Sequence, residues 1–368
     1  MSIANRLLNY LMYLSSLSLE FFRSYDHRKI SFQPSFNLII GNNGTGKTNI
    51  LESIYLLSAC KSFRASKLSQ LLKWETSYAS VVGLIEKNNE PITLEAQLIV
   101  DPKYPNKPST KRFLINSIQK TRKEFLGTLK TVVFQPDDIR LVTGSPSRRR
   151  EFLDAVFLQS EWRYAQALAQ YHKALKHRNE LLDLIALSKA HRSELFYWDQ
   201  SLVKNAEIIR TFRQQFITHV NDFWSISNHP EVQKLFLDYH QSTITTEKLT
   251  NNFNLDVSRG HTSCGPHLDD FHFQSHIFTD TPDKSLAAWG SRGQQRLSVL
   301  ALKLAEINYI ETKTNEKPVL LLDDIFSELD PDHQQLVIEI CHDYQSIITS
   351  ADGQINGLLS KNALLISP

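Results

Sequence analysis

The pattern of apolar and polar positions changes three times along the chain. From Tyr13 onward the residues alternate, with Leu17, Leu19 and Phe21 on one face, which predicts a strand with one buried side. Residues 93–100 alternate in the same way and predict a half-buried antiparallel strand. Residues 37–40 are apolar and enter a glycine-rich loop, after which residues 49–59 have helical spacing. The first 140 residues are therefore predicted to be mixed α/β.

A helical segment interrupts this pattern. Residues 147–229 contain neither glycine nor proline, and their apolar residues recur at helical spacing. After Pro230 the α/β pattern returns, and the apolar runs 319–322 and 346–349 predict buried parallel strands. We expect an inserted helical domain of two to four helices at residues 144–229. Residues 1–143 and 230–368 are expected to form one discontinuous domain around it.

Composition excludes several protein classes. The 368 residues are 41% hydrophobic, with 41 Lys+Arg against 39 Asp+Glu, so the chain is neither disordered nor collagen-like. The three cysteines (Cys60, Cys264 and Cys341) lack metal-binding spacing, and we expect reduced thiols. The net charge of +2 does not by itself indicate a nucleic-acid partner.

The N-terminal residues 7–19 are apolar, but Asn9 and three serines interrupt them, so we expect a strand and not a signal peptide. No stretch reaches the roughly 18 consecutive apolar residues of a membrane span. We expect a soluble, cytoplasmic protein without a membrane partner.

A phosphate-binding motif lies between the first buried strand and its helix. The sequence G-x-x-x-x-G-K-[ST] is matched by Gly41, Asn42, Asn43, Gly44, Thr45, Gly46, Lys47 and Thr48. In such a loop the backbone N–H groups and the helix N-terminus surround a triphosphate. Lys47 is expected to contact the β and γ phosphates, and the Thr48 hydroxyl to bind Mg²⁺. We therefore predict an ATP site.

The second half of a nucleotide site is an apolar strand that ends in carboxylates. Asp323 follows the run 319–322 and is predicted to hold Mg²⁺. Asp324 is predicted to orient or deprotonate the attacking water. Two acids at a solvated strand end are the alternative, but the nearby phosphate loop favours the catalytic interpretation.

Three further elements resemble those of ABC-type ATPases. Ser291, Gly293 and Gln294 match the S-x-G-Q signature at a helix start, which contacts the γ-phosphate held by a partner subunit. Asp330 resembles the D-loop carboxylate, and Gln135 occupies the place of the Q-loop glutamine. The alternative for the signature is a polar cap on a surface helix. Together these elements predict a composite site in an ATP-dependent homodimer.

Three other functions stay open at this point. A transporter's nucleotide-binding subunit normally has a histidine after the D-loop, whereas this chain has Thr349 and Ser350. A P-loop nucleoside kinase does not need a signature motif. A nucleotide-gated structural protein without catalysis would not use Asp324 as a base.

The motifs as a set resemble the RecF family of SMC-like ABC ATPases from Met12 almost to the C-terminus. The matching segments, besides those above, are residues 12–19, 22–25, 62–64, 144–146, 149–154, 265–267, 269–270 and 320–330. The resemblance implies an ABC-type head with a mixed sheet core and an antiparallel β subdomain. It also implies binding to duplex DNA and single-strand/duplex junctions, ATP-dependent dimerisation and weak DNA-stimulated ATP hydrolysis. Its expected partners are RecR, RecO and RecA, in gap repair, replication and the SOS response.

The chain departs from the family pattern at two positions. Leu268 replaces an arginine, and Arg292 occupies a signature position that is often uncharged. Residues 1–11 precede the match and are expected to be a dispensable extension, which leaves Met1 and Met12 as alternative starts.

Two basic clusters are candidates for contact with DNA phosphates. They are Arg148, Arg149 and Arg150, and Lys111, Arg112, Lys120, Arg122 and Lys123. The alternative is a solvated face, with Glu151 and Asp154 as acidic partners of the arginine run.

Overall fold

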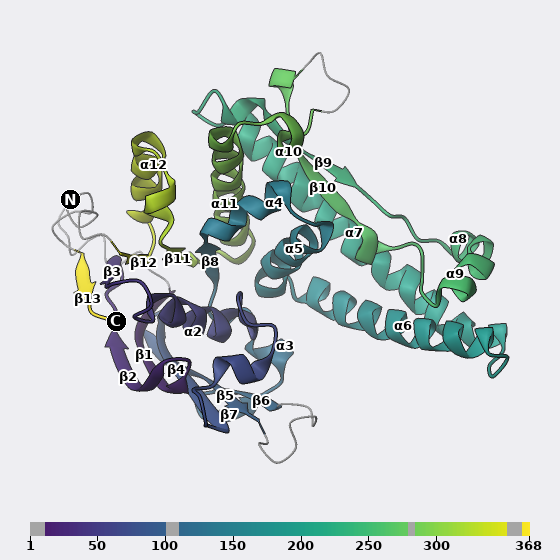
Figure 1. The fold of residues 1–368 in the computed structure, drawn as a ribbon, viewed down its shortest axis with the longest axis horizontal. Coiled ribbons are helices and arrows are strands. Elements are labelled where there is room, and N and C mark those ends of the chain that lie inside the picture. The colour runs from purple at the N-terminus through teal and green to yellow at the C-terminus, as the bar shows by residue number, and fades with distance from the viewer. Residues whose placement is uncertain (1–11, 101–109, 279–283, 352–362) are drawn as a thin grey trace. The chain divides into compact units, whose positions relative to one another are not determined.

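The computed structural model describes residues 12–100, 110–278, 284–351 and 363–368 (Figure 1). The expected extension at residues 1–11 lies outside this part of the chain. Contacts divide the chain into two compact units. The first consists of Met1–Asp138 and Glu306–Pro368, and the second of Ile139–Ala305.

The first unit contains two sheets, one antiparallel with the order β2-β1-β4-β5-β6-β7 and one parallel with the order β13-β3-β12-β11-β8. The antiparallel strands are β1 (Met12–Phe22), β2 (Tyr25–Ser31), β4 (Tyr78–Lys87), β5 (Glu90–Ile99), β6 (Thr110–Ile115) and β7 (Ile118–Lys120). The parallel strands are β3 (Phe36–Ile40), β8 (Thr131–Phe134), β11 (Val319–Asp323), β12 (Ser346–Ser350) and β13 (Leu364–Ile366). The predicted strands at 37–40, 319–322 and 346–349 are therefore confirmed as neighbours in one parallel sheet.

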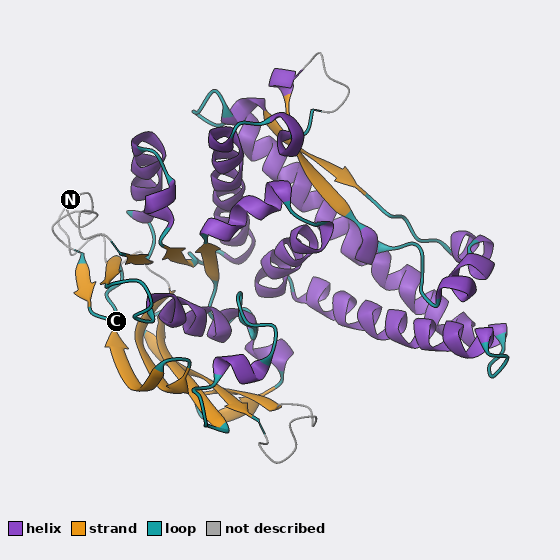
Figure 2. Ribbon diagram, in the orientation of Figure 1, coloured by secondary structure: helices purple, strands orange, loops and turns teal. Residues whose placement is uncertain are grey.

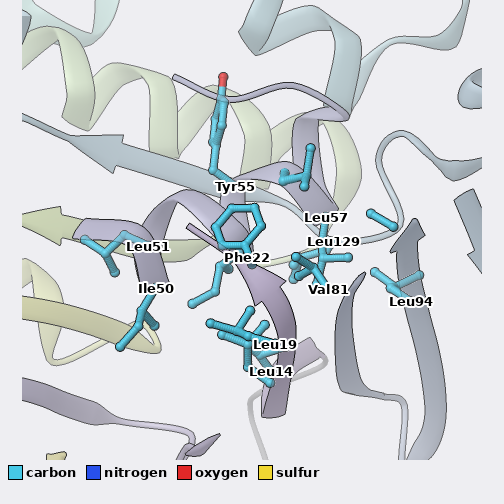
Figure 3. Packing of buried hydrophobic residues seen from close by; sticks show 14 of the residues in the cluster. Leu14, Leu19, Phe22, Ile50, Leu51, Tyr55, Leu57, Val81, Leu94 and Leu129 are labelled. Atoms are coloured by element: carbon cyan, nitrogen blue, oxygen red, sulfur yellow. The ribbon is translucent and has the colours of Figure 1, made fainter. Parts of the chain in front are cut away.

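Helix α2 (Lys47–Ala59) contacts strands of both sheets and joins them into one core. Ile50, Leu51 and Leu57 on the helix are fully buried, as are Val81 and Leu94 on the antiparallel sheet (Figure 3). Burial of each such side chain contributes about 1.5–3 kcal/mol relative to exposure. This core fixes the start of α2, and therefore the glycine-rich loop before it.

The alternation predicted for β1 holds at Leu17 and Leu19 but fails at Phe21. Phe21 has a φ of +49°, and the buried position belongs to Phe22, which is 0% exposed. The left-handed backbone at Phe21 shifts the alternation by one residue, a change that periodicity does not reveal.

Helices α3 (Arg122–Phe125) and α12 (Pro331–Cys341) complete the first unit, and α11 (Arg292–Thr314) crosses the boundary between the units. Cys60, Cys264 and Cys341 are free and buried, in agreement with the expected reduced thiols. Within the described ranges, no helix is long and apolar enough to cross a membrane.

The second unit is mostly helical (Figure 2). Its helices are α4 (Arg140–Thr143), α5 (Pro146–Ser160), α6 (Trp162–Ala186), α7 (Phe196–Ser225), α8 (Thr246–Asn251), α9 (Phe253–Arg259) and α10 (Leu286–Trp289). The expectation of helices without glycine or proline interruptions is confirmed by α5, α6 and α7. Helices α6 and α7 are antiparallel, since Tyr164 contacts Phe212 while Arg178 contacts Asp199.

Residues 230–305 belong to the helical unit, whereas the sequence predicted that the helical domain ends at residue 229. Strands β9 (Leu235–His240) and β10 (Asp270–Ser275) pair with each other, and β9 packs along α7. The strand pattern after Pro230 therefore begins with a two-stranded ribbon of the helical unit.

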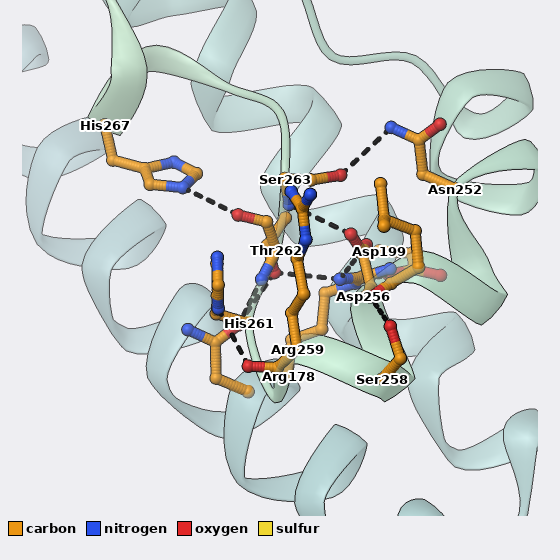
Figure 4. A network of polar contacts seen from close by, with 12 residues as sticks. Arg178, Asp199, Asn252, Asp256, Ser258, Arg259, His261, Thr262, Ser263 and His267 are labelled. Atoms are coloured by element: carbon orange, nitrogen blue, oxygen red, sulfur yellow. Dashed lines mark hydrogen bonds and ion pairs between the residues drawn. The ribbon is translucent and has the colours of Figure 1, made fainter.

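A buried polar network holds the far end of α6 in place (Figure 4). The Arg178 guanidinium donates to Asp199 at 2.6 Å, to Asp256 at 2.8 Å and to the Thr262 hydroxyl at 2.8 Å. Arg178 and Asp256 are both 0% exposed. Because a buried charge needs a partner, this network links α6, α7 and α9.

Candidate nucleotide site

The glycine-rich loop connects β3 to α2. Gly44 and Gly46 have φ values of +86° and +100°, a backbone conformation that favours glycine. A Cβ atom at Gly46 would lie 2.7 Å from the Tyr25 hydroxyl and 2.9 Å from the Ser24 hydroxyl. The local fold therefore requires glycine at position 46, at the N-terminus of α2.

Lys47 points back into this loop. Its ammonium donates to the carbonyl oxygens of Gly41 at 2.5 Å and Asn42 at 3.0 Å, and the residue is 7% exposed. The loop thus carries a fixed positive charge beside the positive end of a helix. This combination binds anions, and phosphates in particular.

The carboxylate Asp323 lies at the end of β11, directly against α2. It accepts hydrogen bonds from the hydroxyls of Thr48 at 2.8 Å and Thr349 at 2.9 Å. Burial raises the pKa of Asp323, although both hydroxyls and the charge of Arg64 act in the opposite direction. A hydroxyl and a carboxylate are oxygen ligands of the kind that Mg²⁺ prefers, so Thr48 and Asp323 fit this ion.

Asp324 follows in a left-handed conformation with a φ of +50°. Its backbone N–H donates to the Thr349 hydroxyl at 3.1 Å and to the Thr349 carbonyl at 3.3 Å. Thr349 therefore contacts both acids: the carboxylate of Asp323 and the backbone N–H of Asp324. From the sequence, Thr349 stands out only as lying where transporter ATPases have a histidine.

These groups surround one cavity of about 320 Å³. Its lining residues are Asn43, Gly44, Gly46, Lys47, Thr48, Asn49, Arg64, Asp323 and Asp324. The predicted phosphate loop and acidic strand are thus brought together. Arg64 is a lining residue whose position the sequence did not reveal, although it belongs to the family segment 62–64. Its segment is fixed by Ser62, which donates to the buried Glu52.

Gln135 begins the turn after β8, and its backbone N–H donates to Asp138 at 2.9 Å. It lies at the carboxyl end of the strand beside β11 but does not line the cavity. The predicted catalytic contact of Gln135 therefore stays a prediction.

The signature residues lie in the second unit, at the start of α11. The Ser291 hydroxyl accepts from the Gln294 backbone N–H at 3.3 Å, and the Gln294 side chain accepts from the Ser291 N–H at 2.9 Å. Ser291 and Gly293 are exposed. This reciprocal cap is the feature that the polar-cap alternative predicts, and its exposure also leaves the motif accessible to a partner.

Asp330 caps α12, where it accepts from the His333 backbone at 3.0 Å and from the His333 ring at 2.7 Å. These hydrogen bonds lower the pKa of Asp330. Asp330 is therefore an anchored, charged side chain on the D-loop segment, and its predicted contact across a dimer is untested.

The arginine run divides into members with different roles. Arg149 is 5% exposed and binds Asp270 through two hydrogen bonds of 2.6 and 2.9 Å. Its guanidinium is thus paired in the interior, which favours a structural role for Arg149, and its contact with DNA stays a prediction. The alternative for the arginine run predicted acidic partners at Glu151 and Asp154. Arg149 does have an acidic partner, but it is Asp270. Arg148 and Arg150 are partly exposed, and Arg150 donates to the Asp269 carbonyl at 2.9 Å.

The second basic cluster lies on β6, β7 and α3 of the first unit. Lys111, Arg112, Arg122 and Lys123 are exposed, and Lys120 is partly exposed. Although the residue as a whole is exposed, the Lys111 ammonium donates to the Cys60 carbonyl at 3.3 Å, and partial desolvation there lowers the pKa of Lys111. Lys111 and Arg112 are consecutive on β6 and therefore point to opposite faces of the sheet, and the contact of this cluster with DNA stays a prediction.

The segment Gly265–Asp270 has a structural role that its sequence did not reveal. Arg213, which is 2% exposed, donates to Asp269 at 2.9 Å and to Asp154 at 3.0 Å. Leu268, in place of the family arginine, is 46% exposed. The acids of this segment therefore hold the second unit together, whereas position 268 faces solvent.

Comparison with known proteins identifies close relatives. Residues 13–360 match the family described as RecF/RecN/SMC N terminal domain. The DNA replication and repair protein RecF of Alkaliphilus oremlandii is 32% identical over 92% of this chain and 93% of its own length. The RecF of Bacillus subtilis is 34% identical over 88% of each chain. A solved structure of the recombination mediator protein RecF with ATP, from the RecFOR pathway, matches with a TM-score of 0.82 at 32% identity over 93% of each chain.

Proposed function

The chain belongs to the RecF family within the RecF/RecN/SMC N-terminal domain group, and we propose that it is an ATP-switched DNA-repair protein. ATP binding would join two copies on DNA, and slow, DNA-stimulated hydrolysis would release them. In this role the protein would help load RecA at single-strand gaps with RecR and RecO, in support of replication and the SOS response.

The observation that carries this proposal is the single cavity containing Lys47, Thr48, Asp323 and Asp324. Its residues divide the work of binding and hydrolysis. Lys47 would exchange its bonds to the loop carbonyls for phosphate oxygens, while Thr48 and Asp323 would hold Mg²⁺. The ion would neutralise phosphate charge when bound. Asp324 would accept the proton of the attacking water, and Arg64 would add positive charge beside the phosphates.

The signature supports a composite site. Ser291, Gly293 and Gln294 do not line the cavity, and Ser291 and Gly293 are exposed on the second unit. In a dimer, the hydroxyl of Ser291 and the N–H of Gly293 would complete the γ-phosphate contacts of the other copy. The missing histidine at Thr349 and Ser350 argues against the transporter alternative, as does the family membership.

The test is the molar mass in solution, measured with and without Mg-ATP and duplex DNA. Asp324→Asn should bind ATP and remain dimeric, since only water activation is removed. Lys47→Ala should bind ATP weakly and stay monomeric. Ser291→Arg should bind ATP as a monomer without dimerising. A monomer under all conditions despite measured ATP binding would refute the switch, and loss of monomer binding in Ser291→Arg would refute the composite site.

A further inference from the structure

A second cavity lies in the helical unit, along the side of the α6–α7 pair. It has a volume of about 540 Å³, larger than the nucleotide cavity. Residues of α6 and α7 alone line it: Trp162, Arg163, Gln166, Ala167, Gln170, Tyr197, Gln200, Ser201, Lys204, Asn205 and Ile208. We refer to it as the α6–α7 groove.

The charge of this groove is of one sign. None of its lining residues is acidic, and two of them, Arg163 and Lys204, are cationic. Both are exposed, and neither forms an ion pair or hydrogen bond with any described residue. The buried arginines of the same unit differ, because Arg178 and Arg213 are each paired with two carboxylates. The groove therefore offers uncompensated positive charge to an anion.

Aromatic side chains stand at both ends of the groove. Trp162 is 62% exposed and Tyr197 is 68% exposed. The Tyr197 ring packs against other rings. Its centroid lies 4.9 Å from that of Trp198, in an edge-on arrangement. Trp198 in turn stacks on His177, with centroids 4.4 Å apart. An exposed ring held by other rings is a preformed stacking surface for a planar ligand.

The rest of the lining is polar. Four side-chain amides, on Gln166, Gln170, Gln200 and Asn205, line the groove, whereas Ala167 and Ile208 are its aliphatic residues. A docked amphipathic peptide needs apolar contacts at helical intervals, and this lining does not supply them. Amides can donate to and accept from the edges of nucleotide bases.

From these observations we propose that the α6–α7 groove binds single-stranded nucleic acid, with bases stacked on Trp162 and Tyr197 and phosphates near Arg163 and Lys204. The residues from Tyr197 to Ile208 extend for about 16 Å at ~1.5 Å per residue. At ~3.4 Å per stacked nucleotide, the α7 side of the groove alone matches about five nucleotides. Trp162 lies farther along α7, since its neighbour Tyr164 contacts Phe212. Helices packed ~8–10 Å apart leave no room for a duplex to enter the groove. The site would give the proposed DNA-repair function a place for the unpaired strand of a gap, and to that extent it rests on the proposed function.

The test uses full-length protein and a fluorescein-labelled oligodeoxythymidylate, with affinity measured by anisotropy over a series of salt concentrations. Tyr197→Ala should weaken binding about 5- to 150-fold, which corresponds to ~1–3 kcal/mol for one stacked base. Tyr197→Phe should retain binding because the ring remains. Phe196→Ala is the matched control, since Phe196 is 67% exposed but does not line the groove.

Charge is tested separately. Lys204→Glu should weaken binding and reduce the slope of log affinity against log salt by at least ~0.7, the value for one phosphate contact on a single strand. Lys234→Glu, at an exposed lysine of the same unit outside the groove, should leave the slope unchanged.

Two outcomes would overturn the proposal. One is that Tyr197→Ala and Lys204→Glu both bind the oligonucleotide within twofold of the wild-type affinity. This includes the case in which Tyr197→Ala weakens only the binding of a protein partner such as RecR. The other is an equal loss for the oligonucleotide and for duplex DNA. Failure of the proposed function would look different: the wild-type protein would not dimerise with Mg-ATP, whatever the groove variants do with the oligonucleotide.

Discussion

Replacement of Arg149 by methionine distinguishes a structural arginine from a DNA-binding one. Its guanidinium makes four hydrogen bonds: two to Asp270, one to the Leu141 carbonyl at 3.2 Å and one to the Gly144 carbonyl at 2.8 Å. The side chains of Arg149 and Asp270 are 6% and 15% exposed. Removal of one partner from a buried ion pair costs about 3–5 kcal/mol. Asp270 would keep only the His272 ring, at 3.0 Å, so we expect a loss near the lower end of this range.

Urea unfolding measures this cost. With a denaturant slope of about 2–3 kcal/mol/M, the transition of the second unit should move by about 1–2.5 M to lower urea. Arg148→Met is the matched control, and a partly exposed position should change stability by no more than ~0.5 kcal/mol. The double variant with Asp270→Asn should lose less than the sum of the single losses, as expected for directly coupled groups.

An Arg149→Met protein that is as stable as Arg148→Met and binds duplex DNA more weakly would contradict the structural role of Arg149. Such a result would mean that Arg149 leaves Asp270 and contacts phosphate. Equal stability together with unchanged DNA binding would also contradict the buried-pair argument.

Three further predictions concern other parts of the chain. Thr349→Val removes the hydroxyl that contacts Asp323 and Asp324, and we expect ~10–100-fold lower ATP turnover or Mg²⁺ affinity, measured by phosphate release against Mg²⁺ concentration; unchanged values would show that this hydroxyl does not position the acids. Burial lowers the pKa of His267, so the neutral ring contributes stability above its usual pKa of about 6.5, and this contribution should be lost as the pH falls through the folded-state pKa. The urea midpoint of wild type should therefore fall more steeply below pH 6.5 than that of His267→Gln, and parallel curves would contradict the assignment. Leu268→Arg restores the family residue at an exposed position and should change stability by less than ~0.5 kcal/mol while steepening the salt dependence of duplex binding; a large loss of stability would show that Leu268 packs in the fold.

Much of the nucleotide site was predictable because its chemistry depends on local sequence. The loop from Gly41 to Thr48 and the acids Asp323 and Asp324 follow buried strands, and parallel strands place their carboxyl ends at one edge of the sheet. Arg64 and Thr349 were not predicted as parts of the site, since their positions depend on contacts between distant segments. The partner of Arg149 lies 121 residues away in the sequence, and no pattern near the arginine run indicates it.

The domain boundary illustrates a second limit of sequence patterns. The return of an α/β pattern after Pro230 is predicted from the sequence, but the strands β9 and β10 and their place in the helical unit are not. Strands β9 and β10 pair with each other and pack on the helical unit, so only tertiary contacts reveal their place. The same holds at Phe21, where one left-handed residue exchanges the buried and exposed faces of β1.

The burial of all three cysteines has a practical consequence for work on this protein in solution. Burial raises the pKa of Cys60 and Cys341 to about 12 and also raises that of Cys264, so the reactive thiolate is scarce at neutral pH. A maleimide dye should therefore react slowly with the native chain and quickly with a cysteine introduced at an exposed position. One such cysteine in each compact unit would allow fluorescence energy transfer to follow their separation during an ATP cycle, without prior removal of the native thiols.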